Sequence, residues 1–336
     1  MRKADLFRAV SAGLLAAALT LGGASAQTDP ARTNPAQTAP SQTSPSQTNL
    51  DRRSFATPEA AAEALRTALT ADDTAELLAI FGPDSAEIID GPDPASARIV
   101  RRQAAKAAAE GMILHRHGPA DAPDGAELAI GRDKWPFPIP LRRTAEGWIF
   151  DTEAGADEIY ARRIGADELD AIAALRAMVR AQQDYAARHR KRVYARYIQS
   201  TAGRSDGLWW DAETAKKAGP SPLSAFVEKQ KAFLEGRQPG DPYRGYTFRM
   251  LTAQGPGAPG GERSFAAKDP LAEDHLEGGF AILAWPADYG QSGIMTFQAG
   301  PDGRIWQKDL GEDTDALVQS IWAFDPSDGW EPVKEP

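Results

Sequence analysis

The sequence predicts an α+β fold in which helices pack on antiparallel sheets in two modules. Three observations support this prediction. Apolar residues recur at helical spacing after position 55, short apolar runs bounded by turn residues follow in two groups, and 336 residues suggest about two domains. The predicted parts are a leader (1–26), a linker (27–52), a first module (53–153) and a second module (154–336).

The first residues have the pattern of an export signal. Arg2, Lys3 and Arg8 are basic, an apolar stretch covers 10–21, and small residues end the pattern at Ala26. A signal peptide cleaved near Ala26 has this arrangement, and the apolar stretch is shorter than the roughly 20 residues of a membrane-spanning helix. The alternative is a buried core helix. We expect a periplasmic or secreted protein with no membrane span.

The predicted linker, 27–52, is rich in Thr, Pro, Ser and Gln and contains the near-repeat NPAQTAPSQTSPSQTN. A tract with so few apolar side chains cannot offset the conformational entropy that folding removes. We therefore predict a disordered spacer. A wall-spanning or partner-binding tail is the alternative for such a composition.

The first module begins with three predicted helices. Thr57 is an N-cap residue followed by proline, and the first helix ends before Asp72. The second helix covers 74–81, and the third covers 95–110 and ends at Gly111. This run of helices precedes any strand pattern, as in an α+β layout.

Four strand segments follow in the first module, namely 112–117, 127–130, 135–141 and 148–150. In the third, Trp135, Phe137, Ile139 and Leu141 share one face, and prolines alternate with them. A central strand cannot lose so many amide donors, so this segment is predicted to be an edge strand or an extended polyproline segment. Glu146-Gly147 predicts a hairpin turn.

The second module is predicted to start with a short helix over 154–164, stopped by Gly165, and a longer one over about 167–199. Acidic residues begin the longer helix and basic residues end it, which suits the helix dipole. An irregular stretch, 200–222, follows. The remaining predicted elements are a helix at 223–234, strands at 246–252, 280–285, 293–299 and 304–308, and a helix at 313–324. Asp302-Gly303 predicts a hairpin turn.

Composition excludes several classes of function. The chain has no cysteine, so a lipid anchor, a disulfide, a thiolate metal site and a cysteine nucleophile are excluded. The net charge is −9, and it becomes −11 when the leader is removed. An acidic protein is poorly suited to nucleic acid or to an anionic lipid surface. We predict no nucleic-acid partner and no cofactor.

Four motifs are candidate sites. Gly203–Gly207 has the G-x-S-x-G pattern but lacks the strand before it and the helix after it, which favours a turn. His115 and His117 lack a third zinc ligand at useful spacing. The acids at 309–315 and the basic run 188–196 are both typical of helix ends, although calcium or an acidic partner would also suit them. We predict no catalytic residue and no metal ligand.

Aromatic residues give the only candidate binding surface. Trp209 and Trp210 are adjacent, and neighbouring residues cannot easily both point inward. Trp135, Tyr243 and Tyr246 could join them in lining a ligand groove, although most large aromatics are simply core. These five residues are the predicted binding residues.

Three segments together resemble the secreted bacterial family catalogued as domain of unknown function 2950. They are WPFPIPL (135–141), YRGYTFRMLTAQGP (243–256) and GFAILAWPADYGQSGIMTF (279–297), and the resemblance extends from about 55 to 332. It implies an exported protein and no particular activity. More weakly, TADDTAELLAIFGPD (70–84) makes the first module similar to NTF2-like (SnoaL-like) cones, and ALRAMVRAQQDYA (174–186) makes the second similar to type IV pilin heads.

These features lead to one hypothesis and its rivals. We expect an exported soluble protein that binds a partner or helps assemble the envelope without catalysis. The partner would be an unidentified envelope protein or a small molecule. The alternative is a periplasmic hydrolase or isomerase, or a small-molecule carrier, that uses a pocket in the first module.

Overall fold

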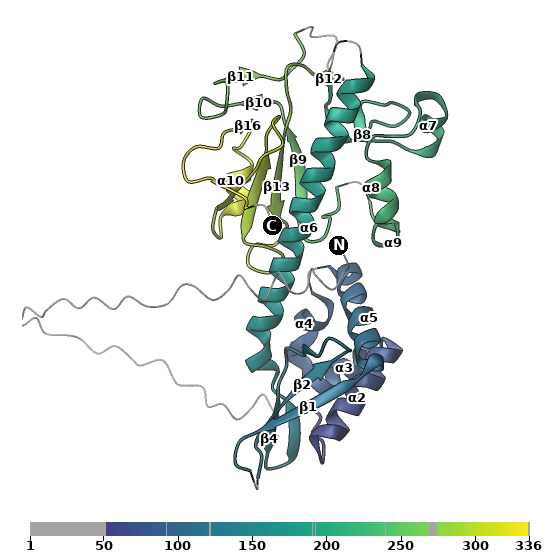
Figure 1. The fold of residues 1–336 in the computed structure, drawn as a ribbon, viewed down its shortest axis with the longest axis vertical. Helices are drawn as coiled ribbons and strands as arrows, with labels where there is room; N and C mark the ends of the chain where they lie inside the picture. Colours follow the sequence, from purple (N-terminus) through teal and green to yellow (C-terminus); the bar gives the residue numbers. More distant parts are fainter. Residues whose placement is uncertain are drawn as a thin grey trace, which may run out of the picture.

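The computed structural model describes residues 52–91, 93–120, 122–189, 191, 193–238, 240–268 and 274–334. The predicted leader and all of the predicted linker except residue 52 lie outside these residues. The described chain forms two lobes joined by one long helix, α6 (Thr152–Arg188) (Figure 1). Each lobe has its own hydrophobic cluster, drawn from 55–150 in one and from 171–324 in the other. The predicted α+β class is confirmed.

The N-terminal lobe packs helices on one antiparallel sheet (Figure 1). Its helices are α2 (Pro58–Ala71), α3 (Thr74–Phe81), the 3₁₀ helix η1 (Pro83–Ser85), α4 (Ala86–Asp90) and α5 (Pro94–Glu110). Its strands are β1 (Met112–His117), β2 (Gly125–Ile130), β3 (Trp135–Pro136), β4 (Leu141–Thr144) and β5 (Gly147–Phe150). The strand order is β1-β2-β4-β5, and β3 pairs with β2.

Polar N-cap residues begin the helices of this lobe. Thr57 Oγ1 accepts the amide of Ala60 at 3.2 Å, and Pro58 follows in the first turn, so the predicted cap is confirmed. Asp93 Oδ1 accepts the amide of Ala95 at 3.1 Å at the start of α5. The same carboxylate also accepts hydrogen bonds from Arg237 of the other lobe.

Aromatic rings occupy the space between the sheet and the helices. The ring of Phe150 lies 5.3 Å from that of Phe81 and 6.2 Å from that of Phe137, measured between centroids. The prolines shorten the third predicted strand to β3, and the chain re-enters the sheet at Leu141 as β4. Ile139 and Leu141 are buried, so the predicted apolar face does point into the core.

One prediction about the long helix is wrong. Instead of one helix that stops at Gly165 and another that begins at 167, α6 is continuous over 37 residues. A glycine inside a helix costs only about 1 kcal/mol relative to alanine. Contacts on both sides of Gly165 offset that cost, because Arg163 binds carbonyls near the end of α4 and Glu168 binds two amides of the C-terminal lobe.

The long helix also ends earlier than predicted, at Arg188 rather than 199. The buried side chain of Gln182 donates to the carbonyl of Ala195 at 2.8 Å and accepts its amide at 2.9 Å. These bonds hold residue 195 in a short strand beside the helix instead of in the helix. The predicted module boundary, 153/154, falls in the first turn of α6, and the division into two modules at that point stays a prediction.

The C-terminal lobe is built from short strands around α6. Its strands are β6 (Tyr194–Ala195), β7 (Tyr197–Gln199), β8 (Gly207–Trp209), β9 (Tyr246–Leu251), β10 (Ala253–Gln254), β11 (Arg263–Ser264), β12 (His275–Leu276), β13 (Ala281–Pro286), β14 (Met295–Ala299), β15 (Ile305–Asp309), β16 (Ala323–Phe324) and β17 (Glu331–Pro332). Its remaining helices are α7 (Ala212–Ala218), α8 (Ser224–Lys229), α9 (Lys231–Leu234) and α10 (Thr314–Val318). The predicted helix 223–234 is therefore two short helices.

The main sheet of this lobe has the antiparallel order β17-β15-β14-β13-β9. It includes the predicted meander, and its hairpin turns at Gly303, whose φ of 81° only glycine adopts easily. Every residue of β13 is buried, because the strand is contacted by α6, by α10 and by β16. The sheet is thus the centre of the C-terminal core.

The last predicted helix is also wrong in length. The sequence predicted a helix over 313–324, whereas α10 ends at Val318 and β16 follows. Arg249 donates to the carbonyls of Val318 and Ile321, at the end of α10 and just after it. Phe324 pairs instead with Gln254 of β10. Within the described residues, no helix is long and apolar enough to cross a membrane.

Candidate functional site

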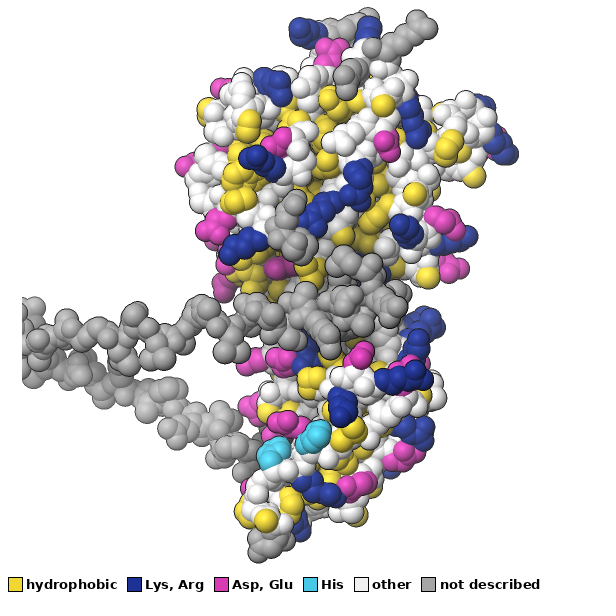
Figure 2. Space-filling view, viewed as in Figure 1, with side chains coloured by type: hydrophobic (Ala, Val, Ile, Leu, Met, Phe, Trp, Pro, Cys, Tyr) yellow, Lys and Arg dark blue, Asp and Glu magenta, His cyan; other side chains and the backbone are white. Residues whose placement is uncertain are grey.

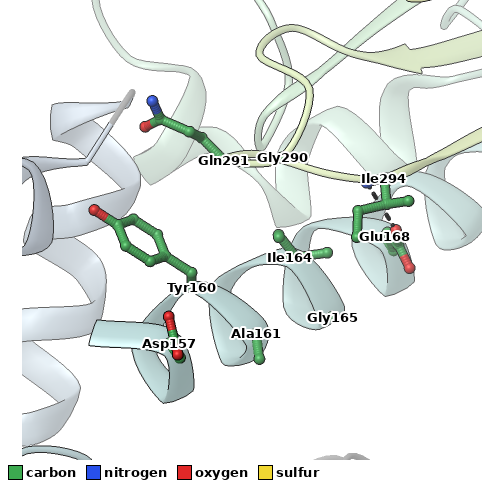
Figure 3. Close-up of a pocket in the computed structure, with 9 residues that line it drawn as sticks. All are labelled: Asp157, Tyr160, Ala161, Ile164, Gly165, Glu168, Gly290, Gln291 and Ile294. Carbon is green, nitrogen blue, oxygen red and sulfur yellow. Dashed lines mark hydrogen bonds between the residues drawn. The ribbon is translucent and has the colours of Figure 1, made fainter. Parts of the chain in front are cut away.

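The long helix is least covered where it passes from one lobe to the other. A cavity of about 590 Å³ opens there between α6 and the loop that joins β13 to β14. Figure 3 shows Tyr160 extending from the helix toward the side where Gln291 extends from the loop. This volume is in the usual range for a small-molecule site.

The lining of this cavity is apolar in the middle and polar at its ends. Ala161, Ile164 and Ile294 supply apolar surface, and Gly165 and Gly290 leave the walls free of side chains. Tyr160, Gln291 and two carboxylates, those of Asp157 and Glu168, add polar groups. The cavity therefore offers an apolar surface with a few hydrogen-bonding groups, which is the usual chemistry of a ligand pocket.

Glu168 fixes one wall of the cavity. Its Oε1 accepts the amide of Ile294 at 3.1 Å and that of Met295 at 3.0 Å. Hydrogen bonds to a charged acceptor are stronger than neutral ones. The carboxylate therefore attaches the β13–β14 loop to α6 and holds Ile294 and its neighbours against the helix (Figure 3).

A group of charged residues lies on the neighbouring face of α6. Burial and the nearby carboxyl of Asp170 raise the pKa of Asp167 to about 8, although Arg163 and Arg244 oppose the rise. Burial also raises the pKa of Asp170, although Arg244 lowers it, with its Nε 3.2 Å from Asp170 Oδ2. Carboxyl groups with raised pKa values are concentrated at functional sites. Asp167 and Asp170 therefore indicate the lobe junction as a candidate site.

The packing around Asp167 is tight. A Cβ placed on Gly245 would lie 2.8 Å from a carboxylate oxygen of Asp167, and the φ of Gly245 is 74°. Only glycine suits that position. Arg163 Nη1 is buried and has no hydrogen-bond partner within the described residues, and burial lowers the pKa of this guanidinium. The junction thus holds a carboxyl with a raised pKa beside an arginine nitrogen that lacks a hydrogen-bond partner among the described residues.

A direct ion pair joins the two lobes beside this group. Arg237 of the C-terminal lobe donates to both carboxylate oxygens of Asp93, the cap of α5. Burial opposes ionisation of Asp93, but hydrogen bonds from Ser96 and Arg237 hold its pKa below the usual value. The guanidinium of Arg237 lies 3.9 Å from the centroid of the Phe233 ring. The lobes are therefore connected by α6 and by this pair.

The polar groups of the cavity lining are two carboxylates, a phenol and an amide. The carboxylates of Asp157 and Glu168 accept hydrogen bonds, and the amide of Gln291 both donates and accepts them. The arrangement can orient a ligand through hydrogen bonds while the apolar residues cover the rest of its surface.

The five aromatic residues predicted to bind a ligand do not form one surface. Trp210 and Tyr246 are buried in the C-terminal core, where the indole donates to Gly219 and the phenol to Met295. Trp209 is half-buried beside that core. Trp209 is the last residue of β8, and Trp210 follows the strand.

The other two predicted aromatics lie nearer the junction. Trp135 lies in the N-terminal lobe with the guanidinium of Arg162, from α6, 4.6 Å from its ring centroid. Tyr243 packs on the ring of Phe233 and precedes Arg244, and burial raises its pKa. Both therefore border the junction and neither lines the cavity.

The remaining motifs lie in structural surroundings. The Gly203–Gly207 motif is a loop between β7 and β8, where the carbonyl of Ser205 accepts the hydroxyl of Tyr185 at 3.0 Å. His115 and His117 lie on β1. No three metal-ligating side chains of the described residues meet in a possible metal site. The basic run 188–196 includes Arg190 and Arg192, which lie outside the described residues.

Sequence reasoning missed the junction residues. Asp167, Glu168 and Asp170 were interpreted as acids at a helix start, because the helix was broken at Gly165. A continuous helix places Arg163 and Asp167 four residues apart on one face, which is the available signal. The partners Arg237 and Arg244 follow in loops, and no local pattern predicts their position.

A family model described as a protein of unknown function (DUF2950) matches residues 52–333. The chain belongs to this family. The match covers both lobes, α6 and the junction, so the family is defined by the whole two-lobed body. Searches of curated proteins and of solved structures gave no match. Since the family description assigns no activity, function must be argued from the site.

Proposed function

We propose that this protein is an exported, non-enzymatic binding protein that holds a small amphipathic molecule at the lobe junction. The observation that carries the proposal is the cavity of about 590 Å³ between α6 and the β13–β14 loop. Export is supported by the signal-peptide pattern of residues 1–26. The rings of Phe81, Phe137 and Phe150 fill the interior of the N-terminal lobe, which favours the junction as the site.

The lining suggests the chemistry of the ligand. Its charged groups, Asp157 and Glu168, are both acidic, which disfavours an anion and favours a neutral or cationic molecule. Ile164 and Ile294 would cover an apolar part, while Tyr160 and Gln291 would bind a polar end. A molecule with one apolar face and hydrogen-bond donors at its ends fits this pattern.

The proposal is tested on the full chain expressed with its leader. Protein recovered from the periplasm or the medium is analysed by native mass spectrometry for a co-purifying small molecule. Nile red, a neutral apolar dye, is then titrated as a probe of the cavity. Ala161→Trp fills the cavity, and Ala166→Trp places the same ring on an exposed position of α6 outside the lining.

We expect the wild type and Ala166→Trp to bind Nile red equally and to keep any co-purifying molecule. Ala161→Trp should weaken dye binding by at least about tenfold, which corresponds to 1.4 kcal/mol. Equal binding by the two tryptophan variants would remove the cavity as the site. Retention of the chain in the cytoplasm would contradict export.

A further inference from the structure

A second hollow lies on the other side of the C-terminal sheet. It has a volume of about 590 Å³ and is bounded by β14, β15, α10, β16 and the chain leading to β17. Gln298 and Lys308 line it. On β14, Gln298 follows Phe297, whose ring packs in the core near that of Tyr246, so the two side chains lie on opposite faces of the sheet, and Lys308 pairs with Thr296 on the face of Gln298. The hollow shares no lining residue with the junction cavity.

Two exposed apolar side chains line this hollow. Trp322 is 64% exposed and Leu317 is 43% exposed, which is unusual for side chains of this size. Trp330 adds a second, half-buried indole. We call this hollow the Trp322 groove. Exposed apolar surface that lines a hollow and has polar groups around it marks an interaction site.

The guanidinium of Arg249 packs against the Trp322 ring. The guanidinium of Arg249 lies 5.0 Å from its centroid and 5.4 Å from that of Trp285. Arg249 also donates to the carbonyls of Val318 and Ile321, so the same side chain fixes the turn that carries the tryptophan. A ring positioned this way loses little conformational freedom when a ligand stacks on it.

The polar lining contains both hydrogen-bond donors and acceptors. Asp309, Asp325 and Asp328 supply carboxylates, and Lys308 supplies an ammonium that donates to the carbonyl of Asp328 at 2.6 Å. Ser327 adds a hydroxyl. The lining carries three carboxylates and one ammonium, so it disfavours an anion, and all of these groups can bond to the hydroxyls of an uncharged ligand. Mixed donors and acceptors suit hydroxyl groups, which do both.

We propose that the Trp322 groove binds a neutral glycan. The apolar C–H face of a hexose stacks on an indole ring, while its hydroxyls bond to carboxylates, amides and ammonium groups around the ring. Trp322 supplies the ring, and Asp328 and Lys308 supply polar groups beside it. This site is independent of the junction cavity and would give the exported protein a second ligand of a different class.

The test measures affinity of the full chain for two neutral oligosaccharides, cellohexaose and chitohexaose, by calorimetry. Pentalysine and oligogalacturonate serve as cationic and anionic probes. Trp322→Ala removes the stacking ring, and Trp322→Phe keeps a smaller one. Tyr197→Ala is the control, because this tyrosine is a 40% exposed aromatic outside the groove. Thermal unfolding confirms that each variant is folded.

We expect at least one neutral oligosaccharide to bind the wild type and Tyr197→Ala equally. Trp322→Ala should weaken binding by about tenfold, the value of 1.4 kcal/mol, and Trp322→Phe should fall between them. Ala161→Trp should leave this affinity unchanged, so failure of the junction proposal does not affect the result. Absence of oligosaccharide binding, or equal binding by Trp322→Ala, overturns the proposal. Trp322-dependent binding of pentalysine alone would assign the groove to a cationic peptide.

Discussion

The two halves of α6 differ in how deeply they are buried. Only Thr152 and Gly155 are buried in the first half, whereas most positions from Ala171 to Ala186 are buried in the second. The second half lies in the core beside the main sheet. The first half is held through side chains such as Arg163 and Glu168, which bond to backbone groups of both lobes.

This difference shows how one helix can be a core element and a site at once. The buried half needs no special contact to stay helical, because burial of apolar surface stabilises it. The exposed half depends on individual polar contacts, and the space beside it remains open as the junction cavity. Substitutions in the two halves should therefore differ in size and in kind.

The largest expected effect is in the buried half. Leu175→Ala should lower the free energy of unfolding by about 2–5 kcal/mol, because a fully buried leucine leaves a cavity when it is truncated. Leu169→Ala, in the exposed half, should cost less than about 1 kcal/mol because this side chain is 38% exposed. Urea unfolding of both variants measures the contrast. Equal losses would show that the halves are equally packed.

The next effect is a pH dependence at the junction. Folded Asp167 keeps its proton up to a pKa of about 8, whereas the unfolded chain releases it near 3.8. Unfolding between these values releases a proton, so stability falls as pH rises through this window.

Between pH 6 and pH 8 the wild type should lose on the order of 2 kcal/mol relative to Asp167→Asn, which cannot ionise. Urea unfolding at several pH values measures the difference. The exposed Asp184→Asn, in the other half of the helix, is the control and should follow the wild type. Parallel curves for Asp167→Asn and the wild type would show that Asp167 is ionised at neutral pH.

A smaller effect is expected for the attachment of the β13–β14 loop. Glu168→Ala should cost about 1–3 kcal/mol, because the amides of Ile294 and Met295 lose their acceptor. Glu168→Gln keeps an acceptor oxygen and should cost less. Amide hydrogen exchange at these two residues should speed up in the alanine variant first. Unchanged exchange would mean that the loop is held by packing alone.

The smallest effect is expected at the helix surface. Arg162→Gln removes the contact with the Trp135 ring and the pair with Glu158, and should cost about 0.5–1 kcal/mol. Arg180→Gln, at an exposed position of the buried half, should leave stability unchanged within measurement. Chemical denaturation compares them, and a larger loss for Arg180→Gln would reverse the comparison.

The fold class and most elements could be predicted because their signals are local. The cap at Thr57, the prolines after Trp135 and the turn at Gly303 each act through neighbouring residues. Two of the errors occur where a distant residue binds the backbone. Gln182 binds the backbone of Ala195 beside α6, and Arg249 binds the carbonyl at the end of α10.

The candidate site could be predicted only in part for the same reason. Tyr243 and Trp135 border the junction, but Glu168 and Gln291 come together across more than a hundred positions of sequence. An aromatic residue can be selected as a candidate binding residue from its type alone. A carboxylate that binds two amides of a remote loop looks like any surface acid until the chain is folded.

The sequence by itself determined the α+β class, the family, the acidic charge and the lack of cysteine chemistry, because composition and local periodicity carry these properties. Tertiary structure alone decided that α6 continues through Gly165, that burial raises the pKa of Asp167, and that two separate hollows exist. The physical reason is that burial, pKa and cavity shape depend on which distant residues surround a group. No local pattern specifies those neighbours.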